Sequence, residues 1–507
     1  MKVTMLLSFR KRVLDMRPSN EVLVPSILVT LGAFAMACLS STYVYLIEQA
    51  VCRKHFMVKD PARINGAGLV DEESCKIPDI QAQVASINGI YMFLAFLPAF
   101  LFTGPYRQLA KVLGRKIVIF MNICGFVIDS CFFIAVCYCY TVFDIRWIYL
   151  APFLWVFGGG TVIFQSLLYT YISESVDSKH LSGVLYKLRA VQLLANFFAM
   201  GLSAYLLRKN VWLQCFIGIG TLAVMMPITA LLHDHVAPTK EKIPSYTFFD
   251  SDSEDSEDCE TTTLLTDSPA PTTKQTSILI TLSNPLLENM THTITLFKQI
   301  IQSSPFCHTT MLTYFLLSFA NAIDNIFAQW SSLTFSWILA DVNAVNSLGT
   351  LVSFTVLLSL PILSSILKPQ FDNCSSKVDF FMVKASVIAW GVGVLFMALA
   401  PTRKMLIAAV VVGNFGAGTY DALRGFVTGL LGGKEEIEQF YVGIGIMETV
   451  GGMLGTVAWS AVFREVVGMA QWVLRVPYGF CAVLMVSVLV CAVVLGRVGR
   501  RVTKTRR

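Results

Sequence analysis

The chain has 507 residues, of which 55% are hydrophobic and only 14% are charged. A soluble globular protein carries about 25% charged residues, so the composition excludes a water-covered surface and predicts a polytopic membrane protein. The formal net charge of +6 does not indicate nucleic-acid binding, because the basic residues lie between and beyond apolar runs rather than in one patch.

The apolar runs predict the helices that cross the membrane. The first run follows a basic N-terminal stretch and is too long for the apolar core of a cleavable signal peptide. Because a crossing takes roughly 20 apolar residues, we count about twelve crossings. The first six are Val22–Ile47, Ile80–Phe102, Ile117–Cys139, Trp147–Tyr171, Val184–Leu207 and Val211–Leu232. The second six are Phe306–Leu333, Val342–Leu367, Phe380–Ala400, Met405–Leu431, Phe440–Phe463 and Leu474–Leu495.

A polar central segment divides these crossings into two halves. It is rich in charge and poor in apolar residues, which predicts a disordered linker. The predicted organisation is an N-terminal segment (1–21), a six-helix half (22–232), an acidic linker (233–304), a second six-helix half (305–496) and a basic tail (497–507). In the linker, Ser251, Ser253 and Ser256 stand among acids, as the sites of acid-directed kinases do, which makes them candidates for phosphorylation.

Charge between the runs predicts the orientation. The stretch between the second and third runs holds Arg107, Lys111, Arg115 and Lys116, and cationic loops stay at the cytoplasmic face. We therefore predict that both termini are cytoplasmic, with the plasma membrane favoured over vacuolar or other internal membranes. Cys52 and Cys75 flank one polar loop, and if that loop is extracytoplasmic they can form a disulfide.

The stretch from Pro105 to Lys116 also carries a resemblance to a known family. It reads P-Y-R-Q-L-A-K-V-L-G-R-K, which aligns without a gap with the P-Y-G-x-L-A-D-R-x-G-R-K loop of the major facilitator superfamily. Upstream of it, Glu48–Arg53 and Asp71–Lys76 look like the first external loop of a fungal group of this superfamily that is distantly similar to the proton-coupled folate transporter family. The resemblance implies an all-α fold of two six-helix halves that rock about a substrate site near the membrane midplane.

Together with the preceding glycine, this stretch is the predicted cytoplasmic gating loop. Its candidate gating residues are Gly104, Arg107, Lys111, Gly114, Arg115 and Lys116. It departs from the family pattern, because Lys111 stands where the family has an acid and Arg107 where it has a glycine. The resemblance implies that the acid holds the outward-open state shut at the cytoplasmic side. A base cannot make that contact, since it repels a positive helix end. We therefore expect this latch to be altered or replaced by other pairs.

Ionisable side chains at membrane depth are costly, so they are candidates for substrate or proton binding. The candidates that we single out within predicted crossings are Asp129, Asp324, Asp421, Arg424 and Glu448, and Gln329 lies about one turn beyond Asp324. Asp421 and Arg424 are close enough along one helix face to pair with each other. Alternatively, Arg424 attracts an anionic substrate group and Asp421 tunes it.

Glu448 is the best candidate for a protonatable site, because burial of a carboxyl favours its neutral form. We expect Asp324 and Gln329 to line the same cavity, and for Asp129 we favour a structural role.

Two functions fit this pattern. The first is a secondary active transporter that moves a small organic solute by alternating access, with proton coupling left open. The alternative is a sensor or receptor of the same fold that transports weakly or not at all. We find no Ser/His/Asp or metal-ligand constellation, so we expect neither an enzyme nor a metal or other cofactor. The expected partners are the solute, protons and the lipid bilayer, with no nucleic acid, and the chain is expected to act as a monomer.

Overall fold

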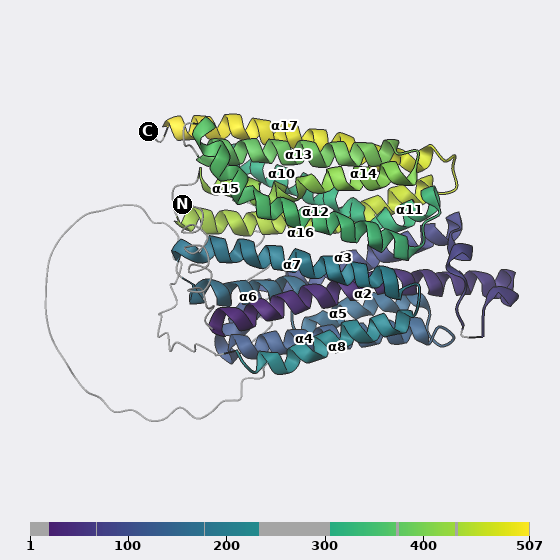
Figure 1. The fold of residues 1–507 in the computed structure, drawn as a ribbon. Helices are drawn as coiled ribbons and strands as arrows, with labels where there is room; N and C mark the ends of the chain where they lie inside the picture. The colour runs from purple at the N-terminus through teal and green to yellow at the C-terminus, as the bar shows by residue number, and fades with distance from the viewer. Residues whose placement is uncertain are drawn as a thin grey trace, which may run out of the picture.

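The computed structural model describes residues 20–66, 68–176, 178–232, 305–371, 375–430 and 434–505. These residues form helices, with one isolated β-bridge between Ile64 and Val70. Figure 1 shows the long helices running side by side as a bundle, with the start of α2 and the end of α17 at the same end. The predicted linker, including Ser251, Ser253 and Ser256, lies outside the described residues.

The elements fall into two groups along the chain. Those of the first half are α2 (Asn20–Lys59), η1 (Pro61–Arg63), η2 (Glu72–Cys75), α3 (Pro78–Leu113), α4 (Arg115–Tyr138), η3 (Ile145–Leu150), α5 (Ala151–Leu154), η4 (Trp155–Phe157), α6 (Gly160–Ser175), α7 (Ser178–Leu206) and α8 (Val211–Thr229). Those of the second half are α10 (Pro305–Asn321), η5 (Ala322–Ile326), α11 (Phe327–Phe335), α12 (Leu339–Leu367), η6 (Lys368–Phe371), α13 (Ser375–Leu399), α14 (Arg403–Asn414), η7 (Phe415–Gly418), α15 (Thr419–Thr428), α16 (Lys434–Val466), η8 (Val473–Arg475) and α17 (Val476–Thr505).

Eleven segments of the described chain are long and apolar enough to cross a membrane. The helix that completes the set of twelve is α7, the fifth crossing along the chain, which has 29 residues and carries Lys187 and Arg189. These two charges lower its hydropathy without shortening it. The structure is therefore the expected all-α membrane protein with a twelve-helix architecture.

Each half has its own apolar core, and the halves meet along two pairs of helices. One pair is α3 with α16, and the other is α7 with α12. In both pairs the second crossing of one half packs against the fifth crossing of the other half. The two interfaces are thus the same contact repeated with the halves exchanged, as expected for a fold built from two related repeats.

Several crossings are broken where the sequence predicts continuous helices. In the fourth crossing the chain turns at Gly159 and Gly160, whose φ angles of +90° and +80° favour glycine. Backbone carbonyls freed by such a break need partners within a membrane. Asn122 of α4 supplies one, because its amide nitrogen donates to the Gly158 and Gly160 carbonyls. The seventh and tenth crossings are interrupted by the short 3₁₀ segments η5 and η7.

The structure corrects the prediction of a loop from Pro105 to Lys116. The structure continues α3 as a helix to Leu113, turns at the single residue Gly114 and begins α4 at Arg115. Pro105 is accommodated inside the helix. Gly114 has a φ of +90°, so a residue with a side chain would be strained at this turn. The connection is therefore a one-residue corner between two helices rather than a flexible hairpin.

The two ends of the bundle differ in the residues that they carry. The disulfide end carries the bond between Cys52 and Cys75 and the start of α12 at Leu339. The basic end carries the corner at Gly114 with Arg115 and Lys116.

Candidate functional site

An ion pair joins the tenth and eleventh crossings inside the second half. One guanidinium nitrogen of Arg424, on α15, donates to both carboxylate oxygens of Glu448, on α16, at 2.9 Å each. The two side chains are 40% and 23% exposed, so the pair is neither sealed in the core nor open to bulk solvent. The predicted direct pair between Asp421 and Arg424 is not formed among the described residues, because Arg424 turns to Glu448 instead.

Polar side chains of α10 and α15 surround this pair. The Ser318 hydroxyl donates to the Glu448 carbonyl oxygen at 2.5 Å, which fixes α10 against α16. Tyr314 and Tyr420 lie within electrostatic range of both Arg424 and Glu448, and their ring centroids are 6.5 Å apart. The Tyr314 hydroxyl is buried without a hydrogen-bond partner among the described residues. The pair therefore sits at the edge of an aromatic wall.

A second pair of charges faces across the two halves. Arg189 of α7 is exposed and acts electrostatically on Asp421 of α15, beyond ion-pair distance. The same Arg189 acts on Tyr169, whose hydroxyl donates to Gln192 at 3.0 Å. We call Arg189, Asp421, Arg424 and Glu448 the central charge cluster. It holds two positive and two negative groups, and it includes members from both halves.

Arg189 is the member that sequence reasoning missed. Arg189 falls inside the predicted crossing Val184–Leu207, but the segment Glu174–Arg189 also reads as a cytoplasmic connection, so Arg189 is not among the predicted site residues. In the structure α7 begins at Ser178, which places Arg189 about 16 Å along the helix at 1.5 Å per residue. The apolar turn before Arg189 could have identified it, since Val184 and Leu185 already read as part of a crossing.

Three other predicted site residues form no ion pair or hydrogen bond with this cluster among the described residues. Asp324 is exposed on the 3₁₀ segment η5, within electrostatic range of Tyr420 and Tyr478. Gln329, on α11, is buried, and neither its amide nitrogen nor its amide oxygen has a partner among the described residues. Asp324 and Gln329 therefore differ in environment, and their predicted shared cavity stays a prediction.

Asp129 lies in the apolar core of the first half. It is buried on α4, and its Oδ1 has no hydrogen-bond partner among the described residues. Its surroundings are aromatic: Tyr43 stacks on Phe133 at 3.9 Å between ring centroids, and the Tyr43 hydroxyl donates to Ser130 at 2.9 Å. The buried indole N–H of Trp155 is also without a partner there. Asp129 thus belongs to the packing of one half rather than to the cluster between the halves.

The predicted gating residues hold the first half together at the basic end. Arg115 forms an ion pair with Glu174 at the end of α6, and the Lys116 amine donates to the Ala230 carbonyl at 2.6 Å. The Tyr106 hydroxyl donates to the Val156 carbonyl in the broken fourth crossing. The side chains of Arg107 and Lys111, and the surroundings of Gly104, lie outside what the structure describes.

At the disulfide end, hydrogen bonds cross from one half to the other. Arg208 at the end of α7 pairs with Asp341 in the first turn of α12, and Glu72 accepts the Leu339 backbone N–H at 2.6 Å. Further along the bundle the crossing bonds are Ser41 to Asn343, Asn88 to the Asn325 carbonyl, Ser347 to the Phe197 carbonyl and Thr350 to the Met200 sulfur. The halves are therefore closed against each other at this end.

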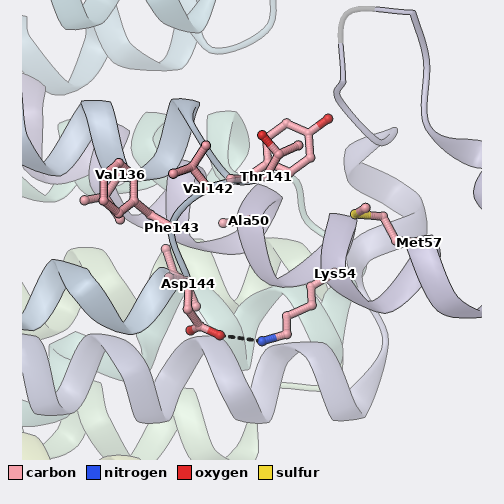
Figure 2. Close-up of a pocket in the computed structure, with 10 residues that line it drawn as sticks. Ala50, Lys54, Met57, Val136, Thr141, Val142, Phe143 and Asp144 are labelled. Atoms are coloured by element: carbon pink, nitrogen blue, oxygen red, sulfur yellow. Dashed lines mark hydrogen bonds and ion pairs between the residues drawn. The ribbon is translucent and has the colours of Figure 1, made fainter.

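A small side cavity also opens at the disulfide end. It has a volume of about 230 Å³, and Figure 2 shows its wall, which includes an ion pair of 2.6 Å between Lys54 and Asp144. The hydrogen bond from Lys54 and the Arg146 backbone N–H hold the pKa of Asp144 below its usual range. Every lining residue, from Ala50 to Ile145, belongs to the first half. The cavity is thus separate from the interface between the halves.

Comparisons with known sequences find fungal transporters that are similar to this chain. No family model matches it. It is 25% identical over 437 residues to the MFS-type transporter aprT of Aspergillus flavus, covering 85% of this chain and 80% of that protein. It is 22% identical over 443 residues to the MFS efflux pump atnC of Emericella nidulans, covering 86% of this chain and 81% of that protein.

Solved structures show the same fold. The nucleoside transporter NupG matches with a TM-score of 0.57 at 15% identity, covering 93% of this chain and 99% of that chain. The human organic anion transporter MFSD10 matches with a TM-score of 0.56 at 14% identity, with the same coverage. At such identities the structures support the architecture alone. The resemblance to folate transporters stays a prediction.

Proposed function

We propose that this chain, a member of the major facilitator superfamily of transporters, is a secondary active transporter that moves a small organic solute by alternating access through the central charge cluster. The observation that carries the proposal is the pairing of Arg424 with Glu448 near Asp421, with Arg189 of the other half within electrostatic range of Asp421. Charged groups at membrane depth cost free energy, and they are usually kept for substrate or ion binding.

In the proposed cycle, Glu448 is the group that takes up a proton. A protonated Glu448 no longer attracts the Arg424 guanidinium, which then becomes available to an anionic or strongly hydrogen-bonding group of the solute. Loss of the proton restores the pair and expels that group. Coupling in this scheme follows from competition between Glu448 and the solute for the same cation.

Orientation is part of the same proposal. The disulfide supports an extracytoplasmic position for the end that carries it, because disulfides persist in oxidising compartments. The basic corner at Arg115 and Lys116 supports a cytoplasmic position for the opposite end. We propose that, with the disulfide end closed, the central charge cluster is reached from the cytoplasm. We propose that the protein works in this orientation in the plasma membrane, as a monomer with both termini inside.

The test begins with the solute, which is found by comparing metabolites inside and outside cells with and without the protein at two external pH values. The variants are Glu448→Gln and Arg424→Ala, and the matched control is Glu465→Gln, which removes an exposed acid from the same helix. We expect the control to reproduce the wild-type metabolite change, while both cluster variants lose it. Unchanged metabolite profiles in both cluster variants at normal expression would overturn the proposal.

A further inference from the structure

We propose that the loop braced by the disulfide is a latch that holds the two halves together at the disulfide end, with Glu72 as the group that joins them. The inference rests on the proposed alternation between two states, but it concerns a different region from the central charge cluster. Its observations are a crossing hydrogen bond, a buried chain of charges and the covalent brace beside them.

The crossing bond satisfies a helix end that its own sequence leaves open. The first backbone N–H groups of a helix need acceptors, and a polar N-cap side chain commonly provides one. The N-cap of α12 is Ile338, which has no side-chain acceptor. Glu72 of the first half takes this role, because its Oε1 accepts the Leu339 N–H at 2.6 Å. A carboxylate is especially suited here, since a helix N-terminus carries partial positive charge.

A chain of charges leads from this bond into the first half. The Lys76 amine lies 2.9 Å from Glu72 and 2.7 Å from Glu48, whose side chains are 15% and 2% exposed. Gln81 adds a hydrogen bond of 2.8 Å to Glu48. Burial opposes the charge of Lys76, but the two neighbouring carboxylates outweigh it and raise the pKa of this amine above its usual range.

The group formed by Glu48, Glu72 and Lys76 is one positive charge short. Two carboxyl groups share the single ammonium of Lys76, so with both of them ionised the group as a whole has an excess negative charge. The N-terminus of α12 supplies roughly half a positive charge next to Glu72 when the halves are closed. When the halves separate, Glu72 loses that partner and the excess charge is uncompensated. Closure at this end is therefore favoured by the electrostatics of the loop itself.

The disulfide positions the latch. It ties Cys52 on α2 to Cys75 on η2, the short helix that also contains Glu72. The Gln49 side chain holds the same loop by pairing with both the N–H and the carbonyl of Val70, at 3.1 Å and 3.0 Å. These attachments restrict the freedom of the loop, so Glu72 meets α12 without a large entropic cost.

The test is hydrogen–deuterium exchange of the full chain in lipid nanodiscs, followed by mass spectrometry. The variant is Glu72→Ala, and the matched control is Glu73→Ala, which removes the neighbouring exposed acid. We expect exchange to rise about tenfold in the first turns of α12 in the Glu72 variant, as loss of one charge-assisted bond would give. We also expect it to rise in residues 455–463 of α16, which Glu72 does not touch, and to fall in residues 358–366 of α12 as the basic end closes.

The pattern separates a latch from a local helix cap. Faster exchange confined to residues 337–345 and the loop itself would overturn the proposal, and so would an equal effect of Glu73→Ala. The double variant Cys52→Ser/Cys75→Ser should give the same pattern as Glu72→Ala, with faster exchange at the disulfide end and slower exchange at the basic end. If the disulfide variant fails to fold, the single substitution Glu72→Gln keeps the test decisive. Because exchange reports the conformational balance directly, a failed transport assay does not count against the latch.

Discussion

The disulfide end and the central charge cluster use the same kinds of side chain for different purposes. At the disulfide end, Glu72 and Arg208 reach across the interface and bond the other half directly. In the cluster, Arg424 bonds Glu448 within its own half, while Arg189 faces Asp421 across the halves without reaching ion-pair distance. Bonds made across the interface hold one state, whereas charges left unjoined across it are available to a ligand.

The largest expected effect comes from breaking the ion pair in the cluster. Arg424→Ala removes the cation and leaves Glu448 without its partner in a partly buried site. Loss of hydrogen bonds to a charged group costs about 1.5–3 kcal/mol, which corresponds to roughly a 10- to 150-fold loss of transport rate. The measurement is initial solute flux in proteoliposomes, normalised to protein content.

The reversed pair provides the control for that experiment. The double variant Arg424→Glu/Glu448→Arg keeps both charges in contact but exchanges their helices. If the cation's position against the solute matters, flux stays low while thermal stability recovers. Equal recovery of both would show that the pair has a structural role only.

The sequence predicted the two halves, the pair of Cys52 and Cys75 and five charged residues at depth because each produces a local signal. It could not predict which charges meet, since Glu448 and Arg424 lie on different helices and only packing decides that Arg424 turns away from Asp421. Arg189 was missed because it lies where the predicted crossing Val184–Leu207 overlaps a segment that also reads as a cytoplasmic connection. The corner at Gly114 was read as a loop because Pro and basic residues resemble loop sequence, although a membrane helix accommodates both.

A second prediction compares two arginines on one helix. Arg189 lies on α7 and belongs to the central charge cluster. Arg208 follows the end of α7 and pairs with Asp341 at the disulfide end. We expect Arg189→Gln to lower flux about tenfold, the equivalent of one charged contact with the solute. Arg208→Gln should change flux by no more than about fivefold, because a surface pair contributes about 0–1 kcal/mol. Flux assays on the two variants side by side check this order, and the reverse order would contradict the distinction between the regions.

A third prediction concerns the buried acid that belongs to neither region. Asp129 has no charged partner among the described residues and one unsatisfied oxygen. Asp129→Asn keeps the shape and removes the charge that is costly to bury. We expect thermal stability in detergent to stay equal or to rise, and flux to stay within about twofold of wild type, since apolar-core packing is retained. A large loss of flux with normal stability would move Asp129 into the transport machinery.

The smallest effect is expected for the ion pair between Lys54 and Asp144, which lies at the disulfide end but within one half. The pKa of Asp144 is lowered in the folded protein, so the pair adds stability above the ordinary carboxyl pKa of about 4 and loses it as the pH falls through the lower folded value. The Lys54 and Asp144 side chains are 70% and 40% exposed, which limits the contribution to less than about 1 kcal/mol. Asp144→Asn should therefore lower the thermal midpoint slightly at pH 6 and converge with wild type in strong acid.

The same variant also serves as the location control for the latch. Because this pair joins no residues across the interface, its loss should leave hydrogen exchange at the start of α12 and in α16 unchanged. If Asp144→Asn shifted exchange at both ends as Glu72→Ala is expected to do, any loosening of the disulfide end would be sufficient to open it. The specific role of Glu72 at the α12 N-terminus would then be lost.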